Sequence, residues 1–220
     1  MSAIFAGSAQ WVAASAEARL VGLFRKKTAD AEWQQLQRGL PEHVQVRALA
    51  LNPDDANTIV AATHVGPYKS VDGGDSWVSM NFPVEDVCWS LIYAPGDSRT
   101  LYCGTVDTGV FVSSDGGQSW RQYAIDEPDS VCKMGFPTRV IAVAQDTSDA
   151  NSVYAALEVG GLVSSSDGGQ TWLDRNPPLI AFTEQDAYKS QLFSDTDTEG
   201  MLDSHALATS AAAPGSVFLA

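Results

Sequence analysis

The chain has 220 residues, 45% of them apolar, which is enough to bury the core of an ordinary domain. Its 27 acidic and 13 basic residues give a formal net charge of −14, which disfavours contact with the phosphate backbone of nucleic acids. It contains no run of about 18 apolar residues, and its N-terminal segment lacks the basic start and long apolar core of a signal peptide. If this start is the natural one, we expect a cytoplasmic protein that binds neither nucleic acid nor membrane.

An octapeptide of the form S-x-D-G-G-x-[ST]-W divides the chain into repeats. It occupies residues 70–77, 113–120 and 165–172, and KKTADAEW at 26–33 is a degraded copy. The tryptophans that close the four copies are 44, 43 and 52 residues apart. A period of this size is typical of solenoids and propellers.

Each repeat predicts four short strands, A to D, with the octapeptide joining C to D. In chain order, SAIFAG at 2–7 matches strand B and is followed by strands C and D of the same blade; three complete repeats come next, and the chain ends with strands A and B at 204–220. The predicted all-β fold is a propeller of four-stranded antiparallel blades. The approximate blades are 2–38, 44–81, 87–124 and 138–175, with a half blade at 204–220 and an insertion at 176–203.

The octapeptides themselves are predicted to be structural turns. Their aspartates can accept hydrogen bonds from turn amides, and their glycine pairs supply positive φ at low steric cost. The closing tryptophan carries a large apolar area into the layer beneath. A catalytic or metal-binding role for the Asp-Gly-Gly loop is the weaker alternative. The structural positions are Ser70, Asp72, Gly74, Trp77, Ser113, Asp115, Gly117, Trp120, Ser165, Asp167, Gly169 and Trp172.

These octapeptides, with the preceding G-x-[FYV] strands and the A-L-x-P and Y-A-A runs, resemble the Asp-box, or BNR, repeats of sialidase-type β-propellers. The sequence of these repeats is most similar to that of bacterial Asp-box propellers that resemble xyloglucanases, sortilin ectodomains and photosystem II assembly factors. The resemblance covers nearly the whole chain. It implies the fold, and it implies that the octapeptides lie on the face opposite a ligand site, but it does not identify the function.

The predicted strands do not complete a ring. They number seventeen, whereas four closed blades need sixteen, and the seventeenth duplicates a B strand. A ring of six blades needs roughly 250 residues at about 42 per blade. We therefore expect a partial propeller, about four and a half blades long, that is completed by missing sequence or by a second chain.

The face opposite the octapeptides carries the candidate site. His64, Asp107 and Glu158 lie at equivalent places in the B–C loops, where they could bind a sugar or act as acid and base, although such polar loops are usually just solvated. Candidate ligand-binding residues near the starts of inner strands are Trp89, Arg139 and His205, with Cys132 and Lys133 nearby. Packing is the alternative role for a lone histidine or tryptophan there.

The 176–203 insertion is longer than the other connections between blades, and long loops are usually functional or disordered. We predict a lid or a partner-docking arm, with a merely decorative loop as the alternative. Its apolar residues include Leu179, Ile180, Phe182, Tyr188, Leu192 and Phe193.

The same insertion contains an imperfect calcium-loop pattern. The candidate ligands are Asp195, Asp197, Glu199 and Asp203, with Gly200 at the turn, but Ala206 replaces the usual bidentate glutamate. A weak calcium site or a solvated acidic tip are the alternatives, and no other cofactor is expected. Cys88, Cys103 and Cys132 have neither disulfide-framework nor metal-site spacing, so buried thiols are the better interpretation.

Two function classes remain open. Sialidases are disfavoured because the chain shows no Arg-Ile-Pro segment and no evident arginine triad. A xyloglucanase would need two catalytic aspartates in separate halves of the molecule, and Asp107 or Asp186 could supply at most one. We expect a non-catalytic segment that binds a small-molecule, carbohydrate or protein ligand, with a carbohydrate-active hydrolase as the alternative.

Overall fold

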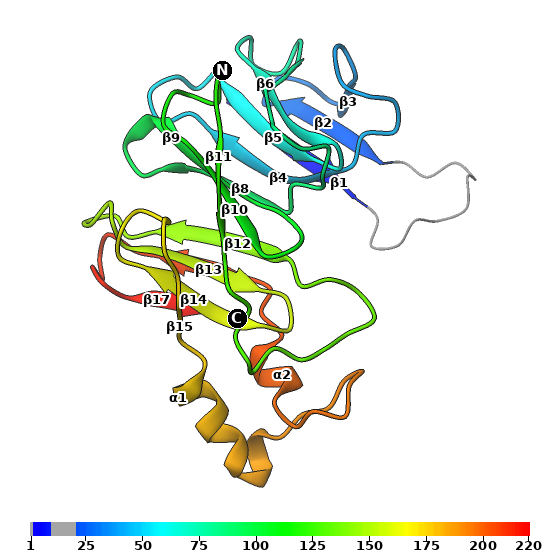
Figure 1. The fold of residues 1–220 in the computed structure, drawn as a ribbon. Coiled ribbons are helices and arrows are strands. Elements are labelled where there is room, and N and C mark those ends of the chain that lie inside the picture. Colours follow the sequence, from blue (N-terminus) through cyan, green and yellow to red (C-terminus); the bar gives the residue numbers. More distant parts are fainter. Residues whose placement is uncertain (1, 10–20) are drawn as a thin grey trace.

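The computed structural model describes residues 2–9 and 21–220, which form successive antiparallel sheets (Figure 1). The first sheet contains β1 (Ala3–Ser8), β2 (Gly22–Lys27) and β3 (Gln34–Leu36). The second contains β4 (Val46–Leu51), β5 (Ile59–Thr63), β6 (Gly66–Ser70) and β7 (Val78–Ser79). Part of the predicted first blade, residues 10–20, lies outside the described residues.

The next two sheets repeat the four-stranded pattern, and a two-stranded sheet follows them. The third sheet contains β8 (Ser90–Ala94), β9 (Asp97–Gly104), β10 (Gly109–Ser113) and β11 (Arg121–Ala124). The fourth contains β12 (Val140–Gln145), β13 (Val153–Leu157), β14 (Gly161–Ser165) and β15 (Leu173–Asp174). The fifth contains β16 (Leu207–Thr209) and β17 (Val217–Leu219). The predicted all-β architecture of four-stranded sheets is confirmed.

The first strands of successive sheets run beside one another. Strand β4 packs against β8, β8 against β12, and β12 against β16, while β1 packs against β4. All the described strand pairs within the sheets are antiparallel. The inner strands therefore gather on one side, as the blades of a propeller do around their axis.

Each intact octapeptide closes its hairpin with the same hydrogen bonds. In the second sheet, the Ser70 hydroxyl donates to the Asp72 carboxylate at 2.7 Å and accepts from the Gly74 amide at 2.8 Å. The Asp72 carboxylate also accepts from the Ser76 amide and hydroxyl at 2.9 and 2.6 Å. The copies at 113–120 and 165–172 repeat this network. Position 74 requires glycine, because its φ is +92° and an added Cβ would meet the Phe5 ring.

The core lies between successive sheets. Trp77 is 2% exposed and packs with Leu23 and Leu36 of the first sheet, while its indole N–H donates to the Gly74 carbonyl at 3.1 Å. Trp120 and Trp172 are only partly buried; Trp120 packs on the core between the second and third sheets, and Trp172 on the core between the third and fourth. The octapeptide tryptophans thus join neighbouring sheets, with Trp77 buried most completely.

The three cysteines are free and buried, as predicted. Cys88 and Cys103 lie between the second and third sheets, and burial raises the pKa of the Cys103 thiol well above its ordinary value. Among the described residues, no helix has both the length and the apolar character that crossing a bilayer requires.

Trp77→Ala should lower the free energy of unfolding by about 3 to 5 kcal/mol, because it removes a buried aromatic side chain between two sheets. Trp33→Ala is the matched control, since Trp33 closes the degraded octapeptide but is 47% exposed, so its loss should cost much less. Denaturant titration of both variants checks this. Equal losses of stability would contradict the role assigned to Trp77.

The octapeptide aspartates should make the stability of the fold depend on pH in the acidic range. Hydrogen bonds from Ser76 lower the pKa of Asp72 to about 2, those from Thr171 lower the pKa of Asp167 to about 2, and those from Ser119 lower the pKa of Asp115. A carboxyl group whose folded pKa is depressed stabilises the fold above its unfolded pKa, and this contribution is lost as the pH falls through the folded pKa.

We therefore expect the melting temperature to fall between about pH 4 and about pH 2. The Asp115→Asn variant should start from a lower melting temperature and lose less of it in this window. Calorimetric scans over this pH range measure the difference. Parallel curves for the variant and the unchanged protein would show that the turn carboxylate contributes nothing to the acid transition.

Candidate functional site

A hollow of about 630 Å³ lies on the face opposite the octapeptides. The B–C loop of the fourth sheet, the connection that enters this sheet, and the 176–203 insertion form its walls. Apolar groups supply much of the wall, and charged groups lie among them. The lining residues are Lys133, Met134, Gly135, Phe136, Glu158, Val159, Phe193, Glu199, Asp203 and His205.

Behind this wall two guanidinium groups stack on one indole ring. The Arg47 guanidinium lies 3.7 Å from the centroid of the Trp89 ring, and that of Arg139 lies 4.4 Å from it. The Arg139 guanidinium also lies 4.6 Å from the centroid of the Phe136 ring. Arg47 lies in β4, whereas Trp89 and Arg139 directly precede β8 and β12, so this cluster joins the inner edges of three successive sheets.

Arg139 also forms an ion pair with the buried carboxylate of Glu158. The Arg139 Nη1 to Glu158 Oε2 distance is 2.8 Å, and the two side chains are 13% and 3% exposed. Burial raises the pKa of Glu158, and the charge and hydrogen bond of Arg139 oppose that rise. Burial also lowers the pKa of Arg47, helped by repulsion from Arg139. The electrostatics of the site thus depend on a few desolvated charges held close together.

The B–C loop of the fourth sheet presents its residues in a strained conformation. Val159 has φ +51°, a region that β-branched residues rarely adopt, and its side chain is 3% exposed. The fully buried Asn176 holds this loop in place: its amide donates to the Gly160 carbonyl at 2.8 Å and accepts from the Leu162 N–H at 2.8 Å. Such enforced strain at a pocket wall is more common at functional sites than elsewhere.

The insertion, which we call the arm (residues 176–203), folds into short helical turns. These turns are α1 (Pro177–Ile180), η1 (Ala181–Glu184), η2 (Asp186–Tyr188) and α2 (Glu199–Leu202). Figure 1 shows the arm in gold to orange, below the fourth sheet and away from the first two. Leu202 and Ile180 pack with Cys132, Val159 and Phe136, so the arm is attached to the wall of the hollow.

A buried carboxylate shapes the tip of the arm. Glu199 is fully buried, and its carboxylate accepts hydrogen bonds from the Phe193 amide at 2.9 Å and the Ser194 amide at 2.6 Å. Burial by itself would raise the pKa of Glu199, but these hydrogen bonds, with those from the Ser194 hydroxyl and the Leu192 amide, lower it. The chain at 192–194 is therefore tied to α2.

Three of the four weak calcium-ligand candidates, Asp197, Glu199 and Asp203, make contacts within the protein. The Glu199 carboxylate faces amides, and the Asp197 carboxylate accepts from Gln191 at 2.6 Å and lies 3.7 Å from the Lys189 ammonium. Within residues 2–9 and 21–220, no group of three or more His, Cys, Asp and Glu side chains is arranged to hold a metal ion. Asp203 instead lies 3.4 Å from the His205 ring nitrogen.

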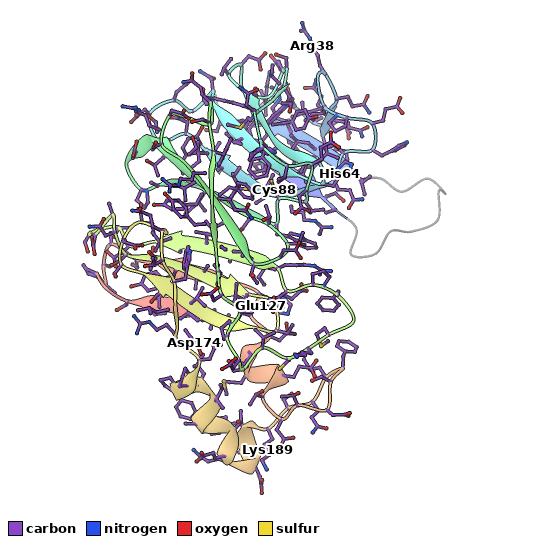
Figure 2. All side chains as sticks on the ribbon, in the orientation of Figure 1. Arg38, His64, Cys88, Glu127, Asp174 and Lys189 are labelled. Carbon is purple, nitrogen blue, oxygen red and sulfur yellow. The ribbon has the colours of Figure 1, made fainter. Side chains whose placement is uncertain are left out.

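The structure brings some of the sequence-predicted site residues together and leaves others apart. Glu158 and His205 line the hollow, and Trp89 and Arg139 form the stack behind it. Asp107 is exposed in its B–C loop, with φ +55°, and does not line the hollow. His64 is half buried beside the second sheet, where burial lowers its pKa, and Figure 2 shows it far from Lys189 of the arm.

Comparison with known proteins identifies the family. Residues 1–176 match the family described as the DUF6242 beta propeller domain. The chain belongs to this family. No curated protein sequence matches it. The predicted β-propeller fold is confirmed, and an incomplete ring is consistent with the observed sheets.

Solved structures support the same fold. An ancestral GH74 enzyme shares 24% identity over 69% of this chain with a TM-score of 0.57, and the match covers 21% of that enzyme. The GH74 enzyme of Niastella koreensis shares 22% over 71%, with a TM-score of 0.54 and 27% of that protein covered. The GH74 xyloglucanase of Xanthomonas campestris shares 19% over 69%, with a TM-score of 0.54 and 27% covered. The chain thus spans about a quarter of these proteins, and the likeness shows the fold alone.

Arg47 and the apolar wall residues Met134 and Phe136 were not predicted from the sequence. Arg47 lies where the register between β4 and β5 shifts, and a bulge there re-aims its side chain. In the repeat alignment Arg47 occupies the same position as Trp89, because each residue directly precedes an equivalent ladder residue, Ala48 or Ser90. This shared position was a usable signal in the sequence. Met134 and Phe136 lie in an irregular connection with no counterpart in the other repeats, so repeat alignment could not find them.

Arg139→Met should lower the free energy of unfolding by about 3 to 5 kcal/mol near neutral pH, because it leaves the Glu158 carboxylate buried without its partner. The pKa of Glu158 is already raised by burial, and losing Arg139 should raise it further. A folded pKa above the unfolded value means that stability falls as the pH rises through this interval. Denaturant titrations at about pH 5 and about pH 8 should therefore show the larger loss at the higher pH.

The double variant Arg139→Met with Glu158→Gln is the control. It removes both charges, so much of the lost stability should return, and the added pH dependence should disappear. If the single variant were as stable as the unchanged protein at about pH 8, the ion pair would not be a determinant of this site.

Proposed function

We propose that this propeller segment is a ligand-binding module that takes its ligand in the hollow on the face opposite the octapeptides. The observation that carries the proposal is the hollow itself, about 630 Å³ in volume and assembled from three separate connections. Ligand sites are typically concave, mostly apolar, and provided with a few fixed polar groups. The fixed groups here are Glu158, tied to Arg139, and Asp203, beside His205.

The side chains that line the hollow indicate which kind of ligand it could bind. Met134, Phe136 and Phe193 offer apolar surface, while Glu158 and Asp203 offer carboxylate oxygens that accept hydrogen bonds. A suitable ligand has a flat apolar face and donor groups at its edge, a description that fits a sugar, a small organic molecule or a side chain of another protein. The strained Val159 and the buried Asn176 support a preformed site.

We further assign the octapeptides to the Asp-box class of propeller turns. The support is the shared network in which the serine hydroxyl and the aspartate carboxylate satisfy the amides of the turn in all three intact copies. In this assignment they are structural, because their carboxylates are occupied by the turn. The binding face is then left to the loops at the other ends of the strands.

A carbohydrate-active hydrolase is the second candidate. One observation favours it: burial raises the pKa of Glu158, and the charge of Asp203 acts in the same direction. Two carboxyl groups with different environments are the arrangement that glycosidases use for general acid and base. The ion pair with Arg139 opposes this role, because it stabilises the ionised form of Glu158.

One experiment separates the two candidates. The protein is titrated against a panel of glycosides, polysaccharides and peptides, while equilibrium binding and the release of reducing ends are both followed. For a binding module, Glu158→Gln should weaken affinity by about 1 to 3 kcal/mol, and no turnover should be seen in any form of the protein. Lys133→Ala, at an exposed position of the wall, should also weaken binding without threatening the fold.

Asp107→Asn is the matched control, because Asp107 is a B–C loop carboxylate that does not line the hollow. It should leave affinity unchanged. Hydrolysis that disappears in Glu158→Gln, with binding retained, would establish the hydrolase instead. Binding that responds to Asp107→Asn but to neither wall variant would place the ligand elsewhere and overturn the proposal.

A further inference from the structure

The arm displays apolar side chains to solvent although it is anchored to the rest of the fold. Phe182, Tyr188, Leu192 and Phe193 are 48, 49, 54 and 90% exposed. The Phe182 and Tyr188 rings stack edge to face, with their centroids 5.7 Å apart. Scattered single apolar residues are ordinary on a surface, but several on one short segment indicate an interaction site. We propose that the arm docks a segment of a partner protein that combines apolar and basic side chains.

The arm is held in one conformation by buried anchors. At its start, the buried Asn176 bonds the fourth sheet and donates to the Ser130 hydroxyl at 3.0 Å. At its end, Leu202 is fully buried against Cys132 and Val159. Between them, the Glu199 carboxylate ties the amides of residues 192–194. A surface that is ordered before binding loses little conformational entropy when a partner arrives.

Phe193 is the residue that this arrangement exposes most. Its amide is fixed by Glu199, while its ring is 90% exposed at the rim of the hollow. The Phe193 amide therefore bonds within the arm, whereas the Phe193 ring is accessible to a partner protein. An aromatic side chain presented on a rigid turn beside a concavity matches the usual character of interface hot spots.

The negative charge of the arm favours a partner with basic side chains. Residues 176–203 include six acidic residues, Glu184, Asp186, Asp195, Asp197, Glu199 and Asp203, and one basic residue, Lys189. Lys189 is shared between Asp186, at 3.1 Å, and Asp197, at 3.7 Å. The whole chain carries a formal charge of −14. An acidic partner would be repelled, whereas lysine or arginine side chains beside apolar ones would complement both features of the arm.

This inference goes beyond the proposed function: Phe193 borders both the arm surface and the hollow, but Lys133→Ala tests the hollow without altering the arm. The probe is a short synthetic peptide that alternates lysine with leucine and phenylalanine, titrated against the full chain. Two control peptides replace either the lysines with glutamates or the apolar residues with serines. We expect measurable binding of the first peptide only, weakened as salt rises.

Phe193→Ser should weaken binding of the probe by about tenfold or more, as expected for a central aromatic contact. Phe218→Ser is the matched control, since Phe218 is 58% exposed on β17 of the fifth sheet, and it should leave binding unchanged. For charge, Asp195→Asn on the exposed arm is compared with Asp30→Asn in the first sheet's turn, and only the former should reduce affinity.

Equal binding of the basic serine peptide and the basic apolar peptide would reduce the effect to general charge attraction and overturn the proposal. Equal effects of Phe193→Ser and Phe218→Ser would also overturn it. If the probe binds and responds to Phe193→Ser but not to Lys133→Ala, the arm is the docking surface whatever the hollow binds. If the glycoside and peptide panel finds a ligand whose affinity falls in Lys133→Ala, and the probe does not bind, the proposed function stands and the arm inference fails.

Discussion

The hydrogen bonds between serine, aspartate and the turn amides in each octapeptide are the constraint on which the rest of the structure depends. They hold strand C to strand D at one end, with the Asp72 carboxylate taking both the amide and the hydroxyl of Ser76. The tryptophan that follows is thereby placed between one sheet and the next, most completely at Trp77. Since each blade cannot bury both faces alone, this junction makes successive sheets into one core.

Fixing the turns at one end of the blades leaves the other end free to vary. The connections there differ in length from blade to blade, and the longest of them, the arm, is attached to the wall of the hollow through Ile180 and Leu202. Loops carried on a rigid scaffold are where binding residues usually lie, because their sequence can change without disturbing the core. The division of labour that we propose between the two faces follows from the geometry of the repeat.

The charged cluster behind the hollow contributes both to the stability of the fold and to the geometry of the candidate site. Arg47 and Arg139 share the Trp89 ring, and Arg139 also neutralises the buried Glu158. The desolvation of these groups is costly, and it is offset by their mutual contacts, so the cluster tolerates the loss of one member poorly. A site built on such coupled groups stays in a single arrangement, which favours recognition of a ligand by a preformed surface.

The sequence by itself determined the repeat, the order of strands and the role of the octapeptides as turns, because period, turn residues and apolar alternation are local properties that survive without knowledge of the fold. It also singled out Glu158, Arg139, Trp89 and His205, since repeat alignment places them near the inner edges. Only the tertiary structure decided that Arg47 joins Trp89 through a bulge in β4, that Phe136 lines the hollow, and that Glu199 binds amides of its own arm. These contacts depend on where irregular backbone carries side chains from distant segments; repeat alignment marks the position of Arg47 but does not record its contact with Trp89.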